Sequence, residues 1–175
     1  MGIEIERKFL LASDDWRASV HESVAMAQGY LNDIGMVDSG AMQASVRVRI
    51  QGEAAFLNIK SRELGARRQE FEYAIPVVDA QALLLLCVGG RIEKTRHYVR
   101  HAGHLWEIDE FLGDNAGLVV AEIELGDVEE MFEKPAWAGA EATHAPRYYN
   151  LALASRPYAQ WREDERMAVD VIEGS

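Results

Sequence analysis

The chain of 175 residues is 49% hydrophobic and 27% charged, which favours one globular domain and argues against a disordered chain. Its net charge of −11 disfavours nucleic acid and anionic membranes as partners, because both are themselves negatively charged. A single cysteine, Cys87, and no run of ~20 apolar residues exclude a disulfide-framed scaffold and a membrane-spanning helix, so we expect a cytoplasmic protein.

Most of the chain alternates polar and apolar residues with a period of two, which is typical of strands with two unlike faces. Seven segments carry charge on one face: residues 3–10, 46–50, 55–62, 68–75, 91–100, 105–111 and 118–125. Residues 27–31 form a weaker strand candidate. Glycines between successive segments, such as Gly52 and Gly103, allow tight turns because glycine adopts positive φ without steric cost. The pattern predicts antiparallel neighbours.

Three helical stretches interrupt these strands: residues 79–88 behind a cap at Asp79, a short helix near Met131 behind the capping-box pair Asp127 and Glu130, and residues 147–154. The pair Gly89 and Gly90 is expected to end the first of them. Ser13 is placed to cap a brief helix over residues 14–20.

Each charged segment places two charges two residues apart, and therefore on one face of its strand. The acidic pairs are Glu4/Glu6, Glu70/Glu72, Glu107/Asp109 and Glu122/Glu124, and the basic pairs are Arg47/Arg49, Lys60/Arg62 and Lys94/Arg96. In an open, half-buried sheet such faces would be in contact with water. In a closed barrel of about eight strands they would converge on a lumen that fits one small ligand. Periodicity leaves both interpretations open.

A lumen lined in this way needs a ligand of mixed charge. Converging lysines and arginines repel one another, and so do converging carboxylates. A polyanion neutralises the first group and a divalent cation neutralises the second. Mg²⁺ and Mn²⁺ bind carboxylate and phosphate oxygens together, and arginine forks match phosphate oxygens. A metal-bound phosphate chain satisfies both requirements.

An ordered series of short motifs carries these charged faces. It runs through EIERK (4–8), GYL (29–31), RVR (47–49), IK (59–60), EFE (70–72), EKTR (93–96), EID (107–109), EIE (122–124) and RYYN (147–150). With this series the sequence resembles the CYTH superfamily, or triphosphate tunnel metalloenzymes, and among them the short bacterial inorganic triphosphatases. The resemblance implies an α+β fold with a closed antiparallel eight-stranded β-barrel and helices packed outside. We place a single tunnel domain at residues 1–158 and a charged tail at 159–175.

The resemblance also implies metal-dependent attack on a linear triphosphate, with Mg²⁺ or Mn²⁺ as cofactor. It assigns metal binding to Glu4, Glu6, Asp109, Glu122 and Glu124. It assigns substrate binding to Lys8, Arg47, Arg49, Lys60, Arg96 and Arg147, to which we add Lys94 because it shares the face of Arg96. Those expected to act in catalysis are Glu4, Glu6, Lys8, Arg49, Glu122 and Glu124. Glu70 and Glu72 are expected to orient basic residues.

We expect the substrate to be inorganic tripolyphosphate, cleaved to diphosphate and phosphate. One alternative is a class IV adenylate cyclase-like activity, in which the ribose 3′ oxygen attacks instead of water. Hydrolysis of thiamine triphosphate or a nucleoside triphosphate is another. A third is a module that binds polyphosphate or nucleotide without turnover, which would need only the basic residues. The sequence leaves open whether the chain acts alone or as a homodimer.

Overall fold

The computed structural model describes residues 2–62 and 66–167. Its strands are β1 (Gly2–Leu11), β2 (Val20–Tyr30), β3 (Ala44–Gln51), β4 (Ala54–Ser61), β5 (Arg67–Ala74), β6 (Val88–His101), β7 (His104–Phe111), β8 (Val119–Glu124) and β9 (Ala138–Glu141). The α-helices are α1 (Ile34–Asp38), α2 (Val77–Leu84), α3 (Asn150–Ser155) and α4 (Glu163–Met167), with short 3₁₀ helices at Asp15–Ser19, Gly113–Asn115, Pro146–Tyr148 and Tyr158–Gln160. In the described residues, no helix has the length and apolar character needed to cross a membrane.

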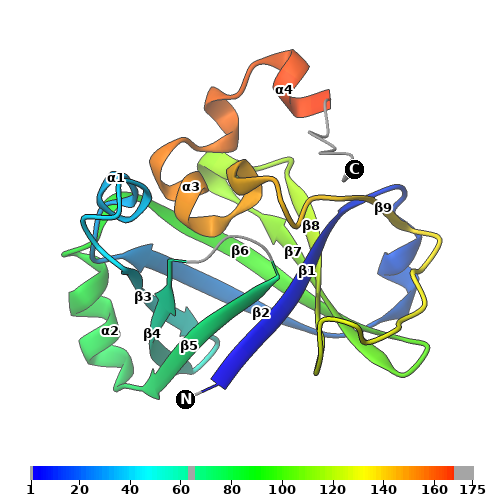
Figure 1. The fold of residues 1–175 in the computed structure, drawn as a ribbon, viewed down its shortest axis with the longest axis horizontal. Coiled ribbons are helices and arrows are strands. Elements are labelled where there is room, and N and C mark those ends of the chain that lie inside the picture. Colours follow the sequence, from blue (N-terminus) through cyan, green and yellow to red (C-terminus); the bar gives the residue numbers. More distant parts are fainter. Residues whose placement is uncertain (1, 63–65, 168–175) are drawn as a thin grey trace.

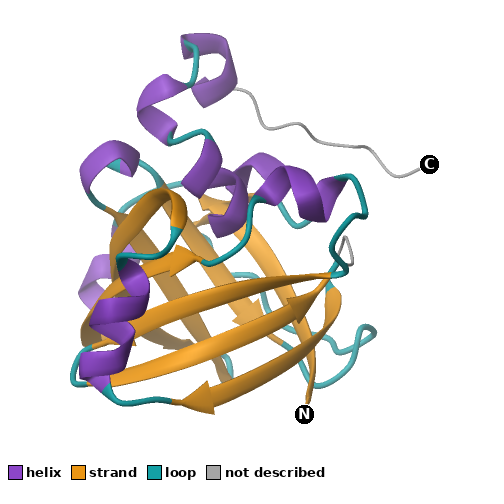
Figure 2. Cartoon of the chain, turned by 90° about the vertical axis from the view of Figure 1, so that its left-hand side faces the viewer, coloured by secondary structure: helices purple, strands orange, loops and turns teal. Residues whose placement is uncertain are grey.

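Eight antiparallel strands close into a barrel in the order β5-β4-β3-β2-β6-β7-β8-β1 (Figure 1). Strand β1 makes the closure. It pairs with β8 along one edge, over Glu6 to Leu10, and its first residues pair with β5 along the other. The short strand β9 takes the remainder of that second edge. Helices lie outside the wall and over one end of the barrel (Figure 2). The expected closed eight-stranded barrel is confirmed.

Apolar side chains on the outer faces of β1, β7 and β8 form one core between the barrel wall and the segments that cover it. Phe9, Trp106 and Ile123 pack there with Trp16 and Trp137, all of them buried. Burial of each such side chain contributes roughly 1.5–3 kcal/mol. The apolar half of the alternating pattern thus faces outward, which leaves the charged half for the lumen.

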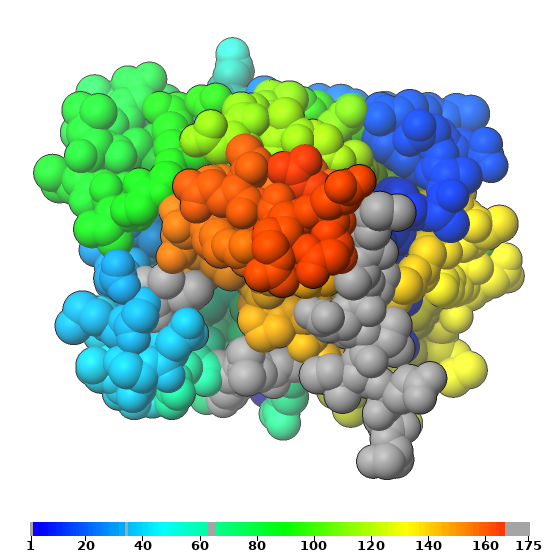
Figure 3. Space-filling view, turned by 90° about the horizontal axis from the view of Figure 1, so that it is seen from above, coloured from blue at the N-terminus to red at the C-terminus, as the bar shows by residue number. Residues whose placement is uncertain are grey.

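A second core closes one end of the barrel. Ile92 and Phe111 lie on the inward faces of β6 and β7 and pack against Tyr148 and Leu153 of the C-terminal segment. In Figure 3 this segment, in orange and red, lies over the centre of that face of the molecule. The lumen is therefore apolar at its closed end and charged along the rest of its length.

The prediction for the helix over residues 79–88 is wrong at both ends. Helix α2 begins at Val77, directly after Pro76, and ends at Leu84. Gly89 and Gly90 lie in β6 instead of ending the helix. Gly89 has a φ of 72°, and a Cβ atom there would lie 2.8 Å from the carbonyl oxygen of Ala154. These glycines are needed for the close approach of α3, which is a tertiary requirement that local helix signals do not report.

The helix predicted near Met131 is absent. The Asp127 carboxylate accepts a hydrogen bond from the Glu129 N–H at 2.9 Å and closes a turn. The chain then continues without regular structure, and Phe132 packs against Phe9 and Trp106. A local capping signal is outweighed here by the packing of one partly buried aromatic side chain against the core.

Strand β2 begins at Val20, well before the predicted residue 27. Residues 21–23 are all exposed, so both faces of this part of the strand are in contact with water and no alternation marks it. Pairing with β6, from Val20 opposite Val99, makes it a strand. The 3₁₀ helix at Asp15–Ser19 matches the brief helix predicted behind Ser13. Helix α1 and strand β9 are additions that the sequence patterns do not predict.

The C-terminal helix over residues 147–154 is present as the 3₁₀ helix Pro146–Tyr148 followed by α3. Part of the predicted tail is folded, because Trp161 is buried and its ring contacts the rings of Tyr148 and Tyr158. Residues 168–175 of that tail lie outside the described residues.

Gly89→Ala is expected to destabilise the fold more than Gly103→Ala. Both glycines have positive φ, 72° and 85°, where any other residue costs roughly 1–2 kcal/mol. A Cβ at position 103 meets open space, whereas at position 89 it meets the Ala154 carbonyl. Urea unfolding of the two variants measures the difference, and equal losses would contradict this account of the α3 contact.

Candidate active site

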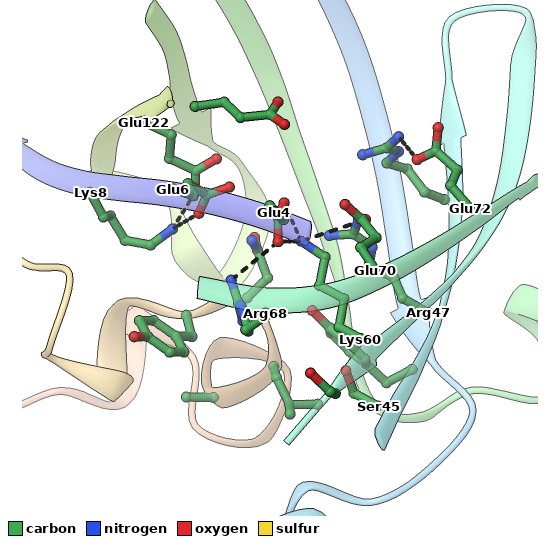
Figure 4. Close-up of a pocket in the computed structure, with 18 of the residues that line it drawn as sticks. Glu4, Glu6, Lys8, Ser45, Arg47, Lys60, Arg68, Glu70, Glu72 and Glu122 are labelled. Atoms are coloured by element: carbon green, nitrogen blue, oxygen red, sulfur yellow. Dashed lines mark hydrogen bonds and ion pairs between the residues drawn. The ribbon is translucent and has the colours of Figure 1, made fainter. Parts of the chain in front are cut away.

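The barrel encloses a cavity of about 1040 Å³, at the upper end of the range of ~300–1,000 Å³ typical of small-molecule sites. Every barrel strand contributes to its lining: Glu4, Glu6 and Lys8 from β1, Tyr30 from β2, Arg47 and Arg49 from β3, Lys60 from β4, Arg68, Glu70 and Glu72 from β5, Lys94, Arg96 and Tyr98 from β6, Glu107 from β7, and Glu122 and Glu124 from β8. Figure 4 shows charged side chains of several strands converging on this space.

All the site residues predicted from the sequence line this cavity except Asp109. Those present are Glu4, Glu6, Lys8, Arg47, Arg49, Lys60, Lys94, Arg96, Glu122, Glu124 and Arg147. The charged faces therefore converge on one lumen, and the interpretation of an open sheet with a solvated charged face is wrong.

Asp109 lies deeper, beside the closed end of the barrel, and is 1% exposed. Its two carboxylate oxygens accept hydrogen bonds from Arg96 Nε at 2.7 Å and Arg96 Nη2 at 2.8 Å, and Lys94 Nζ binds the same carboxylate. Burial would raise the pKa of Asp109, but Arg96 and Lys94 outweigh burial and lower it. The Asp109 carboxylate is thus ionised and already engaged by two cations that reach the cavity.

For Lys94, the effect of burial on the pKa is larger than that of the neighbouring acid. It lowers the pKa of Lys94 to about 8, against the attraction of Asp109. Asn150 of α3 lies 3.4 Å from Lys94 Nζ. Lys94 is therefore a cavity amine whose proton is held less firmly than that of an ordinary lysine.

Lys8 and Glu122 form a buried ion pair across the β1–β8 contact. Glu6 lies 3.4 Å from Lys8 Nζ on the same strand, and Arg96 Nη2 donates to Glu122 at 2.8 Å. Burial alone would lower the pKa of Lys8, but Glu122 and Glu6 raise it. Burial alone would raise the pKa of Glu122, but Lys8 and Arg96 hold it well below its usual range. Both groups stay charged.

Glu70 and Glu72 hold basic residues of strands β3 and β4. Glu72 accepts from Arg49 Nη2 at 2.8 Å, and Glu70 lies 3.6 Å from Lys60 Nζ. Asn58, fully buried on β4, donates its Nδ2 to both carboxylates, at 3.0 Å and 2.6 Å. These contacts agree with the expected orienting role of the two acids.

Comparison with known proteins decides the family. Residues 2–149 match the model of the CYTH domain. The chain belongs to the CYTH domain family. This CYTH domain is 43% identical over 164 residues to an inorganic triphosphatase of Acetivibrio thermocellus, a match that covers 93% of this chain and 100% of the relative. It is 39% identical over 154 residues to an inorganic triphosphatase of Nitrosomonas europaea, covering 86% and 96% of the two chains.

A solved structure agrees with these sequence matches. The crystal structure of the inorganic triphosphatase NE1496 superposes with a TM-score of 0.61 at 34% identity, covering 88% of this chain and 95% of that one. The family resemblance seen in the motifs is thereby confirmed.

The carboxylates of this CYTH domain suit a hard divalent cation. Burial raises the pKa of Glu124, and the charges of Glu4 and Glu6 raise it further, which marks a local surplus of negative charge. In residues 2–62 and 66–167, no three His, Cys, Asp or Glu side chains stand close enough to form a complete cage. The donor chemistry therefore fits an ion bound by one or two carboxylates plus substrate oxygens, which is the usual arrangement for Mg²⁺.

Four cavity residues of this CYTH domain are absent from the predicted metal-binding, substrate-binding and catalytic sets, although Glu107 stands in one of the acidic pairs and both tyrosines stand in the motifs: Tyr30, Arg68, Glu107 and Tyr149. Arg68 shares the inward parity of Glu70 and Glu72, so the alternation itself could have identified it. Glu107 shares a face with Asp109 and, unlike Asp109, reaches the cavity. Tyr149 lies between two short helices and carries no periodic signal.

Proposed function

We propose that this CYTH domain hydrolyses inorganic tripolyphosphate to diphosphate and phosphate with the help of a divalent metal ion. The observation that carries the proposal is the cavity of the barrel, in which buried lysines and arginines face a group of carboxylates. Two relatives that align along nearly their whole length are named inorganic triphosphatase, which supports the same substrate class.

In this proposal the basic residues bind and orient the phosphate chain. Arg47 and Arg49 supply planar forks, while Lys8, Lys60 and Lys94 supply point charges. Charge that develops on the transferred phosphoryl group is stabilised by groups already fixed in place, because Arg96 and Lys8 are held by buried acids. Arg147 lies on the cavity lining near the C-terminal segment, where it can contact one end of the phosphate chain.

The carboxylates divide into two roles. One or two of the carboxylates of Glu4, Glu6, Glu122 and Glu124 would hold the ion, Mg²⁺ or Mn²⁺, together with phosphate oxygens, whose charge it would neutralise. Asp109 acts as a positioning residue for Lys94 and Arg96, since its oxygens are already engaged by them. The acidic chain with its single cysteine suits the cytoplasm, where we propose that the enzyme acts.

The proposal predicts turnover of tripolyphosphate with a kcat/KM well above that for ATP or thiamine triphosphate, and none in excess chelator. The measurement is an assay of free phosphate and cyclic AMP over the three substrates, each with Mg²⁺ and with Mn²⁺. Cyclic AMP as a product, or equal kcat/KM for ATP, would favour the cyclase or nucleotidase alternative. Binding of tripolyphosphate without any product would favour the binding module.

A further inference from the structure

Arg68 is a cavity residue outside the motifs that carry the family resemblance. It lies on β5 at the seam of the barrel, opposite Glu4 of β1, and its side chain is 17% exposed. Figure 4 shows it labelled between Lys8 and Lys60. We infer that Arg68 binds an oxygen of the phosphate chain directly and that the ring of Tyr149 positions it to do so. This inference rests on the proposed function, because it names a further substrate contact of the same site.

The first argument concerns the Nε atoms of the cavity arginines. In Arg47, Arg49 and Arg68 this atom is buried and has no hydrogen-bond partner among the described residues. In Arg96 it donates to Asp109 at 2.7 Å. Buried donors without partners are rare in folded proteins and call for a ligand or water. Arg68 therefore resembles the two arginines assigned to phosphate, and differs from the arginine that is tied to a buried acid.

The second argument concerns charge compensation. The carboxylate nearest to Arg68 in the described residues is that of Glu4, at 3.8 Å, which is longer than a hydrogen bond. Lys60 binds the same carboxylate at 2.7 Å and 2.8 Å and so takes most of its charge. The guanidinium of Arg68 thus donates directly to no carboxylate in the described part of the chain, and it stays a cation at the lumen because, although burial lowers its pKa, the charges of Glu6 and Glu4 raise it. A phosphate oxygen is the ligand that such a fork binds best.

The third argument concerns Tyr149, which fixes the position of two cations. Its ring centroid lies 5.4 Å from Cζ of Arg68 and 5.7 Å from Nζ of Lys8. Both distances are within the range of a cation–π contact. The Tyr149 hydroxyl donates to the carbonyl of Thr143, which anchors the ring. One aromatic ring therefore holds cations from β5 and β1 side by side, at a spacing set by the fold.

The test compares Arg68→Met and Arg68→Lys with a matched control, Arg67→Met. Arg67 is the adjacent residue on the same strand, but it is exposed on the opposite face. Calorimetric titration with inorganic tripolyphosphate in excess chelator measures binding without turnover, and KM is measured separately with Mg²⁺. Arg68→Met is expected to weaken binding and raise KM about ten- to a hundredfold, the loss expected for one charge-assisted contact. Arg68→Lys should recover part of the loss, and Arg67→Met should match the parent.

Parent-like binding and KM in Arg68→Met would overturn the inference and leave Arg68 with a structural role at the β1–β5 seam. A parent that binds tripolyphosphate without hydrolysing it would refute the proposed function alone, since the binding comparison still decides the role of Arg68. If the parent neither binds nor hydrolyses tripolyphosphate, both the proposed function and the role of Arg68 are refuted.

The role of Tyr149 is tested by keeping or removing its ring. Tyr149→Phe loses the hydroxyl contact but retains the ring, and should stay within about threefold of the parent KM. Tyr149→Leu removes the ring and should raise KM toward the value of Arg68→Met with a smaller change in kcat. In the double variant the two effects should add only in part, because Tyr149 acts through Arg68 as well as through Lys8. Additive effects would show that Tyr149 does not act through Arg68.

Discussion

Arg96→Met is expected to lower the free energy of unfolding by about 3–5 kcal/mol, the cost of removing one partner from a buried ion pair. Arg96 is the shared partner of two buried acids, Asp109 and Glu122, which are 1% and 5% exposed. Without the guanidinium, Asp109 keeps Lys94 and Glu122 keeps Lys8, but each loses a hydrogen-bonded cation. Activity should be lost as well, because Lys94 and Lys8 would be drawn toward the unbalanced acids and away from the phosphate chain.

Arg49→Met is the matched comparison for this loss of stability. Arg49 also lies on the lumen, but its partner Glu72 has a side chain that is 42% exposed and can be solvated by water. The expected cost is below about 1 kcal/mol. Urea unfolding of the two variants separates the effects. A loss as small in Arg96→Met as in Arg49→Met would show that the Asp109 cluster contributes little to the fold.

The sequence predicts which side chains point into the lumen, but it does not predict how close each lies to the closed end of the barrel. Closure of a barrel forces one face of each strand inward, so parity alone places Glu4, Arg49 and Glu124 on the cavity. Parity does not indicate how far along the strand a residue lies. Glu107 and Asp109 share a face, yet Asp109 lies next to the apolar residues of the closed end, because α3 packs there.

The pattern of charged pairs also fails to identify uncharged residues that contact the charged groups of the lumen. Asn58 is neutral and joins Glu70 to Glu72, a contact visible only when β4 and β5 are in register. Tyr149 acts through its ring and belongs to no strand. Both depend on which segments meet in space, which period-two patterns along one strand do not encode.

Several charges of the lumen are paired with one another. Lys60 binds Glu4, Lys8 binds Glu122, and Arg49 binds Glu72. Binding of a phosphate chain together with a divalent ion exchanges these internal pairs for external ones. Neither ligand alone completes the exchange, because each would leave one sign of charge unpaired in a confined space. The ion is therefore expected to tighten the binding of the phosphate chain, which still binds, more weakly, in excess chelator.

Glu6→Gln and Arg49→Met are expected to differ in their response to the metal ion. The Glu6 carboxylate has one ion pair among the described residues, with Lys8 at 3.4 Å, and is therefore available to the ion. Glutamine keeps the size of the side chain but removes its charge. Since loss of an outer-shell partner alone costs about 10–100-fold, kcat/KM of Glu6→Gln should fall by about a hundredfold or more, with partial recovery at higher metal concentration.

Arg49→Met removes a guanidinium fork that no added ion replaces. A charge-assisted contact of about 1.5–3 kcal/mol corresponds to roughly ten- to a hundredfold in binding or rate, and this loss should persist at every metal concentration. Measurement of kcat and KM for both variants across a titration of Mg²⁺ distinguishes the two, with thermal melts to confirm folding. If added metal restored the kcat/KM of Arg49→Met, the assignment of Glu6 to the metal ion and of Arg49 to the phosphate chain would be wrong. Parent-like rates in both variants would mean that the lumen is not the site of hydrolysis, because neither a carboxylate nor an arginine of its lining would then be needed for turnover.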